Sequence, residues 1–263
     1  WAGGGGRPLG RIVFTGSQRS SDRGSTDGTE NLIAAVHWAA HGPAPTGENG
    51  DASVIIMHAG NDDGVCAVLP GCSSRKFHSS KRDAFQGINA QPIGTISVGR
   101  GGECEIQVEV KAPTREVATE PIAFDEGKRI LQLVAGSHMY ADQIELATNY
   151  DAILFHGTGL GHLPIEDPNG DSPENVAMRQ AVGDYCANGG VAVMVTQCIH
   201  GPIHMDVYSK GREQQDLGVL GNHATTGPDA ALVKLHFLLS TGQDVQSGWD
   251  ANLCGENASS IFN

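Results

Sequence analysis

The sequence has little positive charge and few aromatic side chains. Lysine and arginine together number 17 against 30 aspartate and glutamate residues, the net charge is −13, and aromatic residues make up only 5% of the chain. A surface this acidic repels the phosphates of nucleic acids and the anionic face of a membrane. We therefore expect that this chain itself grips neither a nucleic acid nor a membrane.

Long apolar runs and paired cysteine motifs are also lacking. No stretch approaches the ~20 apolar residues that a membrane-spanning helix needs, and we expect no secretory signal at the start of the chain. The six cysteines form no C-x-x-C pair. In a chain of 263 residues, such cysteines are typical of reduced intracellular thiols rather than of a disulfide framework. We expect a cytoplasmic protein.

The clearest positive signal is the stretch from Phe14 to Gly28. The run 11–14 predicts a buried strand, and it breaks into a loop rich in hydroxyl, carboxylate and guanidinium groups. Asp27 stands three residues before Glu30, a spacing typical of a capping box at the start of a helix. A strand, a polar loop and a helix in this order place a ligand site at the carboxyl end of the strand in open α/β sheets. A salt-bridged surface loop is the alternative interpretation.

Alternating strands and helices predict an α/β fold with parallel sheets flanked by helices. Between residues 29 and 41, apolar side chains at helical spacing predict a core-facing stripe. The stripe consists of Leu32, Ile33, Val36, Ala39 and Ala40. Strands are expected at 53–58, 65–69, 92–98, 106–110, 130–135, 152–156 and 191–196. Further helices are expected at 141–149, 173–188 and from Pro228 onwards.

The chain is long enough for two compact cores. Residues 112–128 are polar, punctuated by proline and without an apolar period, which is typical of an interdomain linker. We therefore predict two domains, 1–118 and 119–263. The first domain is expected to be incomplete, because a strand follows the glycine-rich opening segment at once, where a helix would normally lead in.

Several short motifs in the second half are weak on their own. The glycines after His156 follow a G-x-G-x-G spacing, and prolines stand where the helix of a dinucleotide-binding loop would begin. A dinucleotide-binding site is therefore not expected here. His200 and His204 are separated by a Gly-Pro pair that prevents a shared helical face, so a zinc pair is not expected. Cys198 lacks the glycine frame of a nucleophile elbow and is interpreted as a core thiol.

The segment from Arg75 to Phe85 holds four cations within eight positions. Crowding by other cations is expected to lower the pKa of Lys76, which would make it a proton acceptor or relay at neutral pH. A lysine beside hydroxyl residues is also what an activated threonine nucleophile requires. A solvated surface patch is the alternative, and the spacing alone does not separate the two.

Four separate stretches, in the same order, resemble the asparaginase/glutaminase superfamily, and within it the family formed by the D subunits of archaeal glutamyl-tRNA(Gln) amidotransferases. The stretches are 14–23, 75–85, 156–164 and 196–199. The resemblance covers essentially residues 11–256 and is far more specific than any single motif. It implies a two-domain, asparaginase-like α/β fold. It also implies a protein that hydrolyses glutamine to glutamate and ammonia.

The resemblance further implies partners and site residues. Ammonia passes to a partner, the E subunit of the amidotransferase, which holds the charged tRNA and activates its glutamyl group with ATP. ATP and Mg²⁺ are therefore expected on the partner, and no cofactor on this chain. Only the catalytic lysine of the family maps here, onto Lys76. Ser17 matches a position whose backbone lies beside the substrate amide. Because the family builds its sites across a homodimer interface, His162 is expected to reach the site of a neighbouring copy.

Two motifs of the family are absent from the sequence. The nucleophilic threonine of the family lies in a G-G-T-I-type turn, and its second threonine and aspartate lie in an H-G-T-D-T motif, both upstream of the position of Phe14. Residues 156–159 are no substitute, because they lack the aspartate. We expect the C-terminal part of a longer enzyme, inactive as a glutaminase by itself. A free-standing L-asparaginase and a non-catalytic binding remnant are the alternatives.

Overall fold

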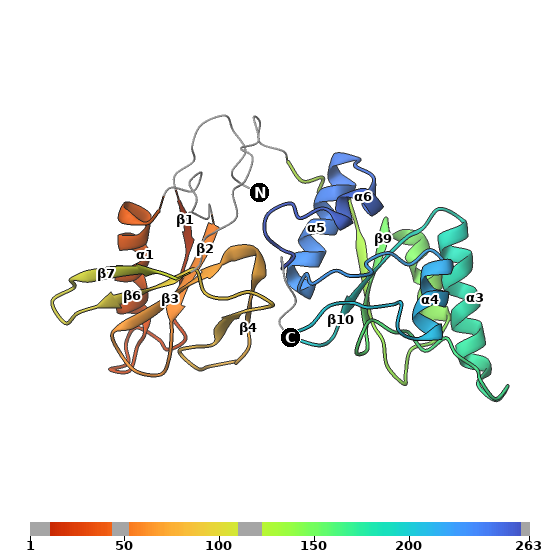
Figure 1. The fold of residues 1–263 in the computed structure, drawn as a ribbon, viewed down its shortest axis with the longest axis horizontal. Coiled ribbons are helices and arrows are strands. Elements are labelled where there is room, and N and C mark those ends of the chain that lie inside the picture. Colours follow the sequence, from red (N-terminus) through yellow and green to blue (C-terminus); the bar gives the residue numbers. More distant parts are fainter. Residues whose placement is uncertain (1–10, 44–52, 110–122, 259–263) are drawn as a thin grey trace. The chain divides into compact units, whose positions relative to one another are not determined.

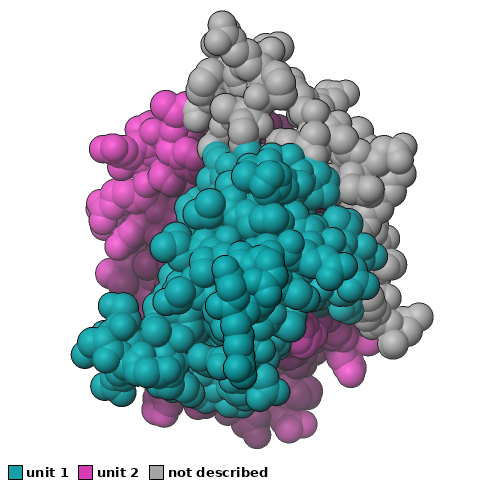
Figure 2. Space-filling view, turned by 90° about the vertical axis from the view of Figure 1, so that its left-hand side faces the viewer, with its two compact units in different colours: residues 1–122 teal, residues 123–263 magenta. Residues whose placement is uncertain are grey.

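The computed structural model of the protein describes residues 11–43, 53–109 and 123–258. The chain divides into two compact units, 1–122 and 123–263, which are coloured teal and magenta in Figure 2. Much of the predicted linker at 112–128 falls on residues 110–122, which lie outside the described residues. The predicted domain boundary at 118/119 therefore stays a prediction.

Unit 1 is built on a mixed five-stranded sheet in the order β1-β2-β3-β6-β7 (Figure 1). Its helices and strands are β1 (Ile12–Phe14), α1 (Gly28–His41), β2 (Ser53–His58), β3 (Val65–Pro70), the 3₁₀ turn η1 (Gly71–Ser73), β4 (Ser74–Lys76), β5 (Phe85–Gly87), β6 (Gly94–Val98) and β7 (Cys104–Val108). β4 and β5 form a separate two-stranded antiparallel sheet.

The expectation of parallel strands is wrong for most of unit 1. Among the described strands of this sheet, only β1 and β2 are parallel, whereas the pairs β2–β3, β3–β6 and β6–β7 are antiparallel. The reason lies in the connections. β2 ends at His58 and β3 begins at Val65, while a parallel crossover needs about a dozen residues or more. The short return instead closes as a hairpin, in which the amide of Ala59 donates to the carbonyl of Val65 at 3.0 Å.

The helix predicted from residue 29 is confirmed. Of its predicted core-facing stripe, Ile33 packs against the core, whereas the other four side chains are exposed. Leu32 and Val36 are 57% and 62% exposed. The buried side of α1 consists instead of Asn31, Ala34, Ala35 and Trp38. The alanines let the helix lie close to the sheet, and the large indole of Trp38 fills the space against β-strand side chains such as Ile56 and Ile96.

β1 is likewise less buried than expected. Among the described residues it pairs only with β2, so it forms an edge of the sheet, and Phe14 is 59% exposed. An edge strand has a sheet partner on one side only, which leaves its side chains with fewer neighbours.

Unit 2 contains the parallel sheet that the sequence predicts. Its strand order is β10-β9-β8, and both strand pairs are parallel. The elements are β8 (Ile130–Val134), α2 (Asp142–Glu145), η2 (Leu146–Asn149), β9 (Ala152–Gly157), α3 (Pro173–Ala187), β10 (Val191–Thr196), α4 (Ser209–Asp216), α5 (Pro228–Thr241) and α6 (Val245–Asp250). The helix predicted at 141–149 is split into an α turn and a 3₁₀ turn. Helices α3 and α4 lie on one side of the sheet, and α5 and α6 on the other (Figure 1).

A buried ion pair fastens the C-terminal segment of unit 2 to α5. The ammonium of Lys234 lies 2.9 Å from Glu256 Oε1, and both side chains are 1% exposed. Lys234 Nζ also donates to the carbonyls of Trp249 and Ala251 at 2.7 and 2.6 Å.

Within the described part of the chain, no helix combines the length and the apolar character needed to cross a membrane.

Candidate active site

The loop after β1 is folded around the carboxylate of Asp27. This buried side chain accepts hydrogen bonds from the amides of Gln18 and Arg19 at 2.9 and 3.0 Å, and from the hydroxyl of Ser17 at 2.9 Å. Burial acts to raise the pKa of Asp27, but the hydrogen bonds outweigh it and hold the pKa below its usual value. The ionised carboxylate therefore determines the shape of the loop.

Asp27 and Glu30 do not form the predicted capping box. Asp27 occupies the position before α1, but it makes no side-chain hydrogen bond to a helix amide, because its oxygens turn back toward the loop. Glu30 instead accepts a hydrogen bond from the amide of Gly64 at 2.8 Å. The spacing predicted where the helix starts, and the structure shows that both carboxylates serve tertiary contacts.

Ser17 is exposed on this loop. Its hydroxyl lies within hydrogen-bond distance of both Asp27 Oδ1 and the carbonyl of Arg19. The side chain is thus engaged inside the loop. Contact between Ser17 and a substrate amide stays a prediction.

A buried polar network lies beneath the loop. Asn31 Nδ2 donates to the carbonyl of Gly16 at 2.9 Å and to Asp27 Oδ2 at 3.1 Å. On its other side, Asn31 Oδ1 lies 2.7 Å from His58 Nδ1, and His58 Nε2 lies 3.0 Å from Glu30 Oε2. This network ties the start of α1 to the end of β2, so the loop is supported from within the core.

His58 is held toward its neutral form. Burial and the nearby guanidinium of Arg82 lower the pKa of His58, while the charge of Glu30 opposes this change. Glu30, His58 and Asp63 place potential metal-ligand atoms within 4.8 Å of one another. Two of these groups are already engaged, Asp63 by Arg82 and Glu30 by the amide of Gly64, so the cluster is better described as a structural network than as a metal centre.

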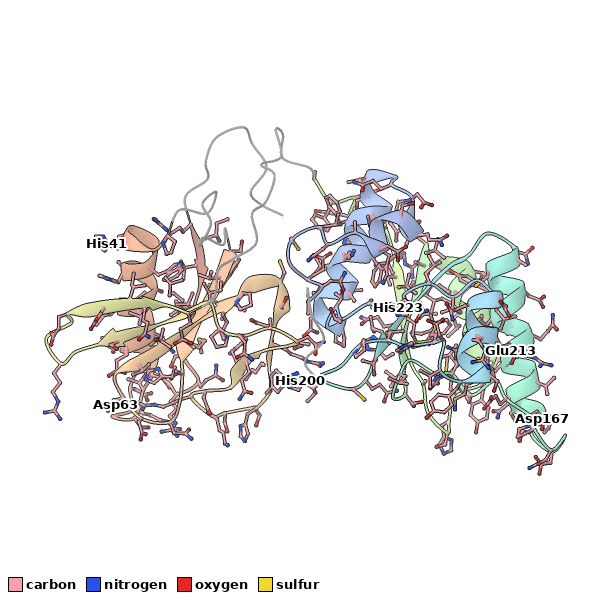
Figure 3. The ribbon with its side chains drawn as sticks, viewed as in Figure 1. His41, Asp63, Asp167, His200, Glu213 and His223 are labelled. Atoms are coloured by element: carbon pink, nitrogen blue, oxygen red, sulfur yellow. The ribbon has the colours of Figure 1, made fainter. Side chains whose placement is uncertain are left out.

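The basic segment 75–85 is anchored by Arg82. This arginine is 7% exposed and donates to the carbonyls of Asn61 and Thr26 at 3.0 and 3.3 Å, and to the carboxylate of Asp63, which is labelled in Figure 3. Through Thr26 it joins the basic segment to the loop after β1. The structure therefore brings together the two polar clusters of unit 1 that the sequence singled out.

Lys76 is the last residue of β4 and pairs with Phe85 on β5. Its side chain is exposed, so Arg82, not Lys76, is the buried cation of the segment. A proton-relay role needs further groups that cover this exposed ammonium. The catalytic role of Lys76 stays a prediction.

In unit 2, the glycine-rich loop (residues 157–163) is held by a buried glutamine from α4. Gln214 Nε2 donates to the carbonyl of Gly161 at 2.8 Å, and its Oε1 accepts from the amide of Leu163 at 2.6 Å. Gln214 is fully buried. The sequence offered no signal for this residue, because a single glutamine in a polar helical stretch has no distinguishing pattern.

His162 belongs to this loop and is 6% exposed. Burial and the charge of Lys210 lower its pKa, whereas Glu166 opposes the change. Its ring lies edge-on to Tyr208, with the centroids 5.4 Å apart. The expected reach of His162 into the site of a neighbouring copy stays a prediction.

Cys198 is exposed, so its interpretation as a core thiol is wrong. The buried strand β10 ends at Thr196, and the amide of Cys198 donates to the hydroxyl of Thr196 at 3.0 Å as the chain turns away. The thiol therefore lies two residues beyond the point where burial stops.

Two family models match the chain. Residues 9–111 match the N-terminal domain of asparaginase, and residues 129–247 match the glutaminase/asparaginase C-terminal domain. The chain therefore belongs to the glutaminase/asparaginase family, and the expected asparaginase-like, two-domain α/β fold is confirmed.

Within this family, the chain is similar to the D subunits of glutamyl-tRNA(Gln) amidotransferases from archaea. It is 33% identical over 231 residues to the D subunit of Thermoplasma acidophilum, covering 87% of this chain and 50% of that protein. It is 34% identical over 252 residues to the D subunit of Saccharolobus solfataricus, covering 94% of this chain and 52% of that protein. The chain thus spans about half the length of the curated relatives it matches.

Solved L-asparaginases share the fold. The thermostable L-asparaginase from Thermococcus kodakarensis superposes with a TM-score of 0.71 at 23% identity, over 95% of this chain and 68% of that one. L-asparaginase I from Vibrio cholerae superposes with a TM-score of 0.67 at 24% identity, over 96% of this chain and 70% of that one. At this identity the likeness concerns architecture alone.

Proposed function

We propose that the chain belongs to the glutaminase component, the D subunit, of a tRNA-dependent amidotransferase of the archaeal type. This component hydrolyses glutamine to glutamate and ammonia. The ammonia is delivered to the E subunit, which converts Glu-tRNA(Gln) to Gln-tRNA(Gln), a ligase reaction of protein biosynthesis. The observation that supports this proposal most strongly is the identity of 33–34% to archaeal D subunits along 87–94% of the chain.

In this proposal, the loop around Asp27 presents the backbone of Ser17 to the amide of the substrate. Lys76 accepts the proton of an attacking threonine hydroxyl and returns it to the departing ammonia. His162 completes the site of a second copy in a homodimer. ATP and Mg²⁺ bind to the E subunit, which also makes the contacts to tRNA, and the hydrolysis of glutamine uses no cofactor on this chain.

We further propose that the polypeptide 1–263 releases no ammonia by itself. Its sequence contains neither of the two threonine motifs that the family uses. Without an attacking hydroxyl, a lysine relay has no nucleophile to activate.

A chimera tests these proposals. The part of the Thermoplasma acidophilum D subunit that precedes the region similar to this chain is joined in front of residues 11–263, because the family resemblance places both threonine motifs there. Ammonia release from glutamine and from asparagine is measured for this chimera and for the unaltered chain, and binding to the E subunit is followed by co-purification. We expect no ammonia release from the unaltered chain. The chimera is expected to hydrolyse glutamine in preference to asparagine and to co-purify with the E subunit.

The other outcomes separate the alternatives. A chimera that hydrolyses asparagine in preference to glutamine and does not co-purify with the E subunit would indicate a free-standing L-asparaginase. Ammonia release by the unaltered chain would contradict the proposed inactivity. A folded chimera that binds the E subunit without hydrolysing either amide would indicate a binding remnant.

A further inference from the structure

Three potential metal ligands converge at the surface of unit 2, outside the candidate active site. They are His204, Asp206 and His223, and one ligand atom of each lies within 4.8 Å of the others. Asp206 Oδ2 is 3.0 Å from His223 Nε2 and 3.9 Å from His204 Nδ1. The two imidazole rings meet edge to face, with their centroids 5.1 Å apart.

We propose that these three side chains bind one divalent transition-metal ion of the zinc class. Two imidazoles and one carboxylate are ligands that Zn²⁺ uses when it keeps an open coordination position. Zinc–ligand bonds of ~2.0–2.2 Å place neighbouring tetrahedral ligands roughly 3.3–3.6 Å apart. The observed separations of 3.0 and 3.9 Å lie on either side of this range, so the ligand atoms need to move by only a few tenths of an ångström to bind one ion.

The carboxylate is already oriented for a metal. Gln215 Nε2 and Asn222 Nδ2 donate to Asp206 Oδ1 at 3.0 and 2.9 Å. Amide donors thus occupy one oxygen and leave Oδ2 directed at the two imidazoles. Hydrogen bonds of this kind orient the ligands in metal sites and fix which atom is offered to the ion.

The backbone segments that carry the ligands are also fastened to each other. Asn222 Oδ1 accepts from the amide of Met205 at 2.8 Å. The amide of Ile203 donates to the carbonyl of Ala224 at 2.8 Å, and the amide of His223 donates back to the carbonyl of Ile203 at 3.1 Å. Such cross-links order the ligands before an ion arrives, which lowers the entropic cost of binding.

One ligand atom lacks a partner in the present arrangement. His204 Nδ1 is inaccessible to solvent and has no hydrogen bond within the described part of the chain. Its distance of 3.9 Å to Asp206 Oδ2 is too long for a hydrogen bond. An ion between the two groups would satisfy this nitrogen, and it would replace the contact of 3.2 Å between His223 Nε2 and Asn222 Nδ2.

The site is connected to the glycine-rich loop. The amide of His204 donates to the carbonyl of Leu160 at 3.0 Å. A metal that fixes His204 would therefore steady the loop that carries His162, without taking part in chemistry there.

Isothermal titration of the metal-free full chain with Zn²⁺ tests the proposal. We expect one equivalent to bind, and His223→Gln and His204→Gln each to weaken binding by at least about 10-fold, the smallest loss seen even when a residue supporting the ligands is removed. His200→Gln is the matched control, because this exposed histidine lies four residues before His204, outside the cluster. It should leave the affinity unchanged.

Cobalt substitution reads the ligands without any mutation. Co²⁺ bound to the wild-type chain should give the visible bands of nitrogen and oxygen ligation without a thiolate charge-transfer band. No stoichiometric binding, equal losses in His200→Gln and His223→Gln, or a thiolate band would each overturn the proposal. Thermal unfolding in a chelator verifies that the variants are folded.

Discussion

Replacing Glu256 by glutamine is predicted to destabilise unit 2 by about 3–5 kcal/mol, the usual cost of removing one partner of a buried ion pair. The substitution leaves the amine of Lys234, which is 1% exposed, without its counter-ion. It also removes the carboxylate that accepts hydrogen bonds from the amides of Leu253 and Cys254 at 3.0 and 2.7 Å. The carbonyls of Trp249 and Ala251 still accept hydrogen bonds from Lys234. The loss of stability is therefore expected to be smaller than for an ammonium buried without any polar partner.

A double-mutant cycle measures the coupling between the two side chains. Lys234→Met alone leaves the carboxylate of Glu256 buried without its cation and is expected to cost a similar amount. The double variant Lys234→Met/Glu256→Gln is expected to cost less than the sum of the two, since neither charge is then left uncompensated. Exposed Glu145→Gln serves as the control and should change stability by less than ~0.5 kcal/mol.

The pH dependence follows from the same pair. Burial acts to raise the pKa of Glu256, but the amide of Leu253 and the ammonium of Lys234 outweigh it, and the pKa lies below its usual value. A carboxyl with a depressed pKa stabilises the fold above its unfolded value and loses that contribution as the pH falls through the folded one. Unit 2 should therefore weaken as the pH drops below the ordinary value of 4.5, and Glu256→Gln should flatten this decline.

Urea unfolding, followed by hydrogen exchange of amides in α5 and α6, measures these changes in unit 2 separately from unit 1. A cost below ~1 kcal/mol for Glu256→Gln, comparable to that of a solvent-exposed pair, would refute the description of a buried pair that holds the C-terminal segment.

Three further substitutions test the loops. Asp27→Asn should cost about 1–3 kcal/mol in unit 1, because the donors of residues 17–19 lose a charged acceptor; urea unfolding with exchange of α1 amides measures it, and an unchanged stability would contradict the role of the carboxylate. Arg82→Met should release the basic segment 75–85 and make it the first site of limited proteolysis, whereas an unchanged cleavage pattern would count against the anchor. Gln214→Ala should cost about 1–3 kcal/mol through unsatisfied backbone groups in the glycine-rich loop, seen as faster amide exchange there, and unaltered exchange would show that the loop is held by other contacts.

The positions of most strands could be predicted from the sequence, because short apolar runs between turn residues mark them. The pairing of the strands in unit 1 could not be predicted from alternation alone. The lengths of the connections hold that information, and the interval between His58 and Val65 is too short for a parallel crossover. In unit 2, helices separate the strands, and there the expected parallel order is confirmed.

The buried face of α1 shows a second limit. Leu32 and Val36 lie at helical spacing, yet they are exposed. Tertiary packing selects the face with Ala34 and Trp38, because a close approach of helix and sheet needs a small residue beside a large one. Hydrophobic periodicity cannot separate two such faces when apolar residues occur on both.

The sequence singles out two polar clusters, the stretch 14–28 and the segment 75–85, and the structure shows that Arg82 joins them through Thr26. The roles of their residues in a substrate site stay predictions. The supporting residues Asn31 and His58 were missed, because a lone asparagine or histidine has no sequence pattern that marks it as a buried link.

The most direct test of the central claim compares two lysines in the chimera. Lys76→Met should reduce ammonia release from glutamine by roughly 10²–10⁴-fold, as the loss of a proton relay requires. Lys81→Met removes a neighbouring exposed lysine of the same segment and should leave the rate within about twofold. Equal rates for the two variants would contradict the assignment of Lys76 and reduce the relationship to a shared fold.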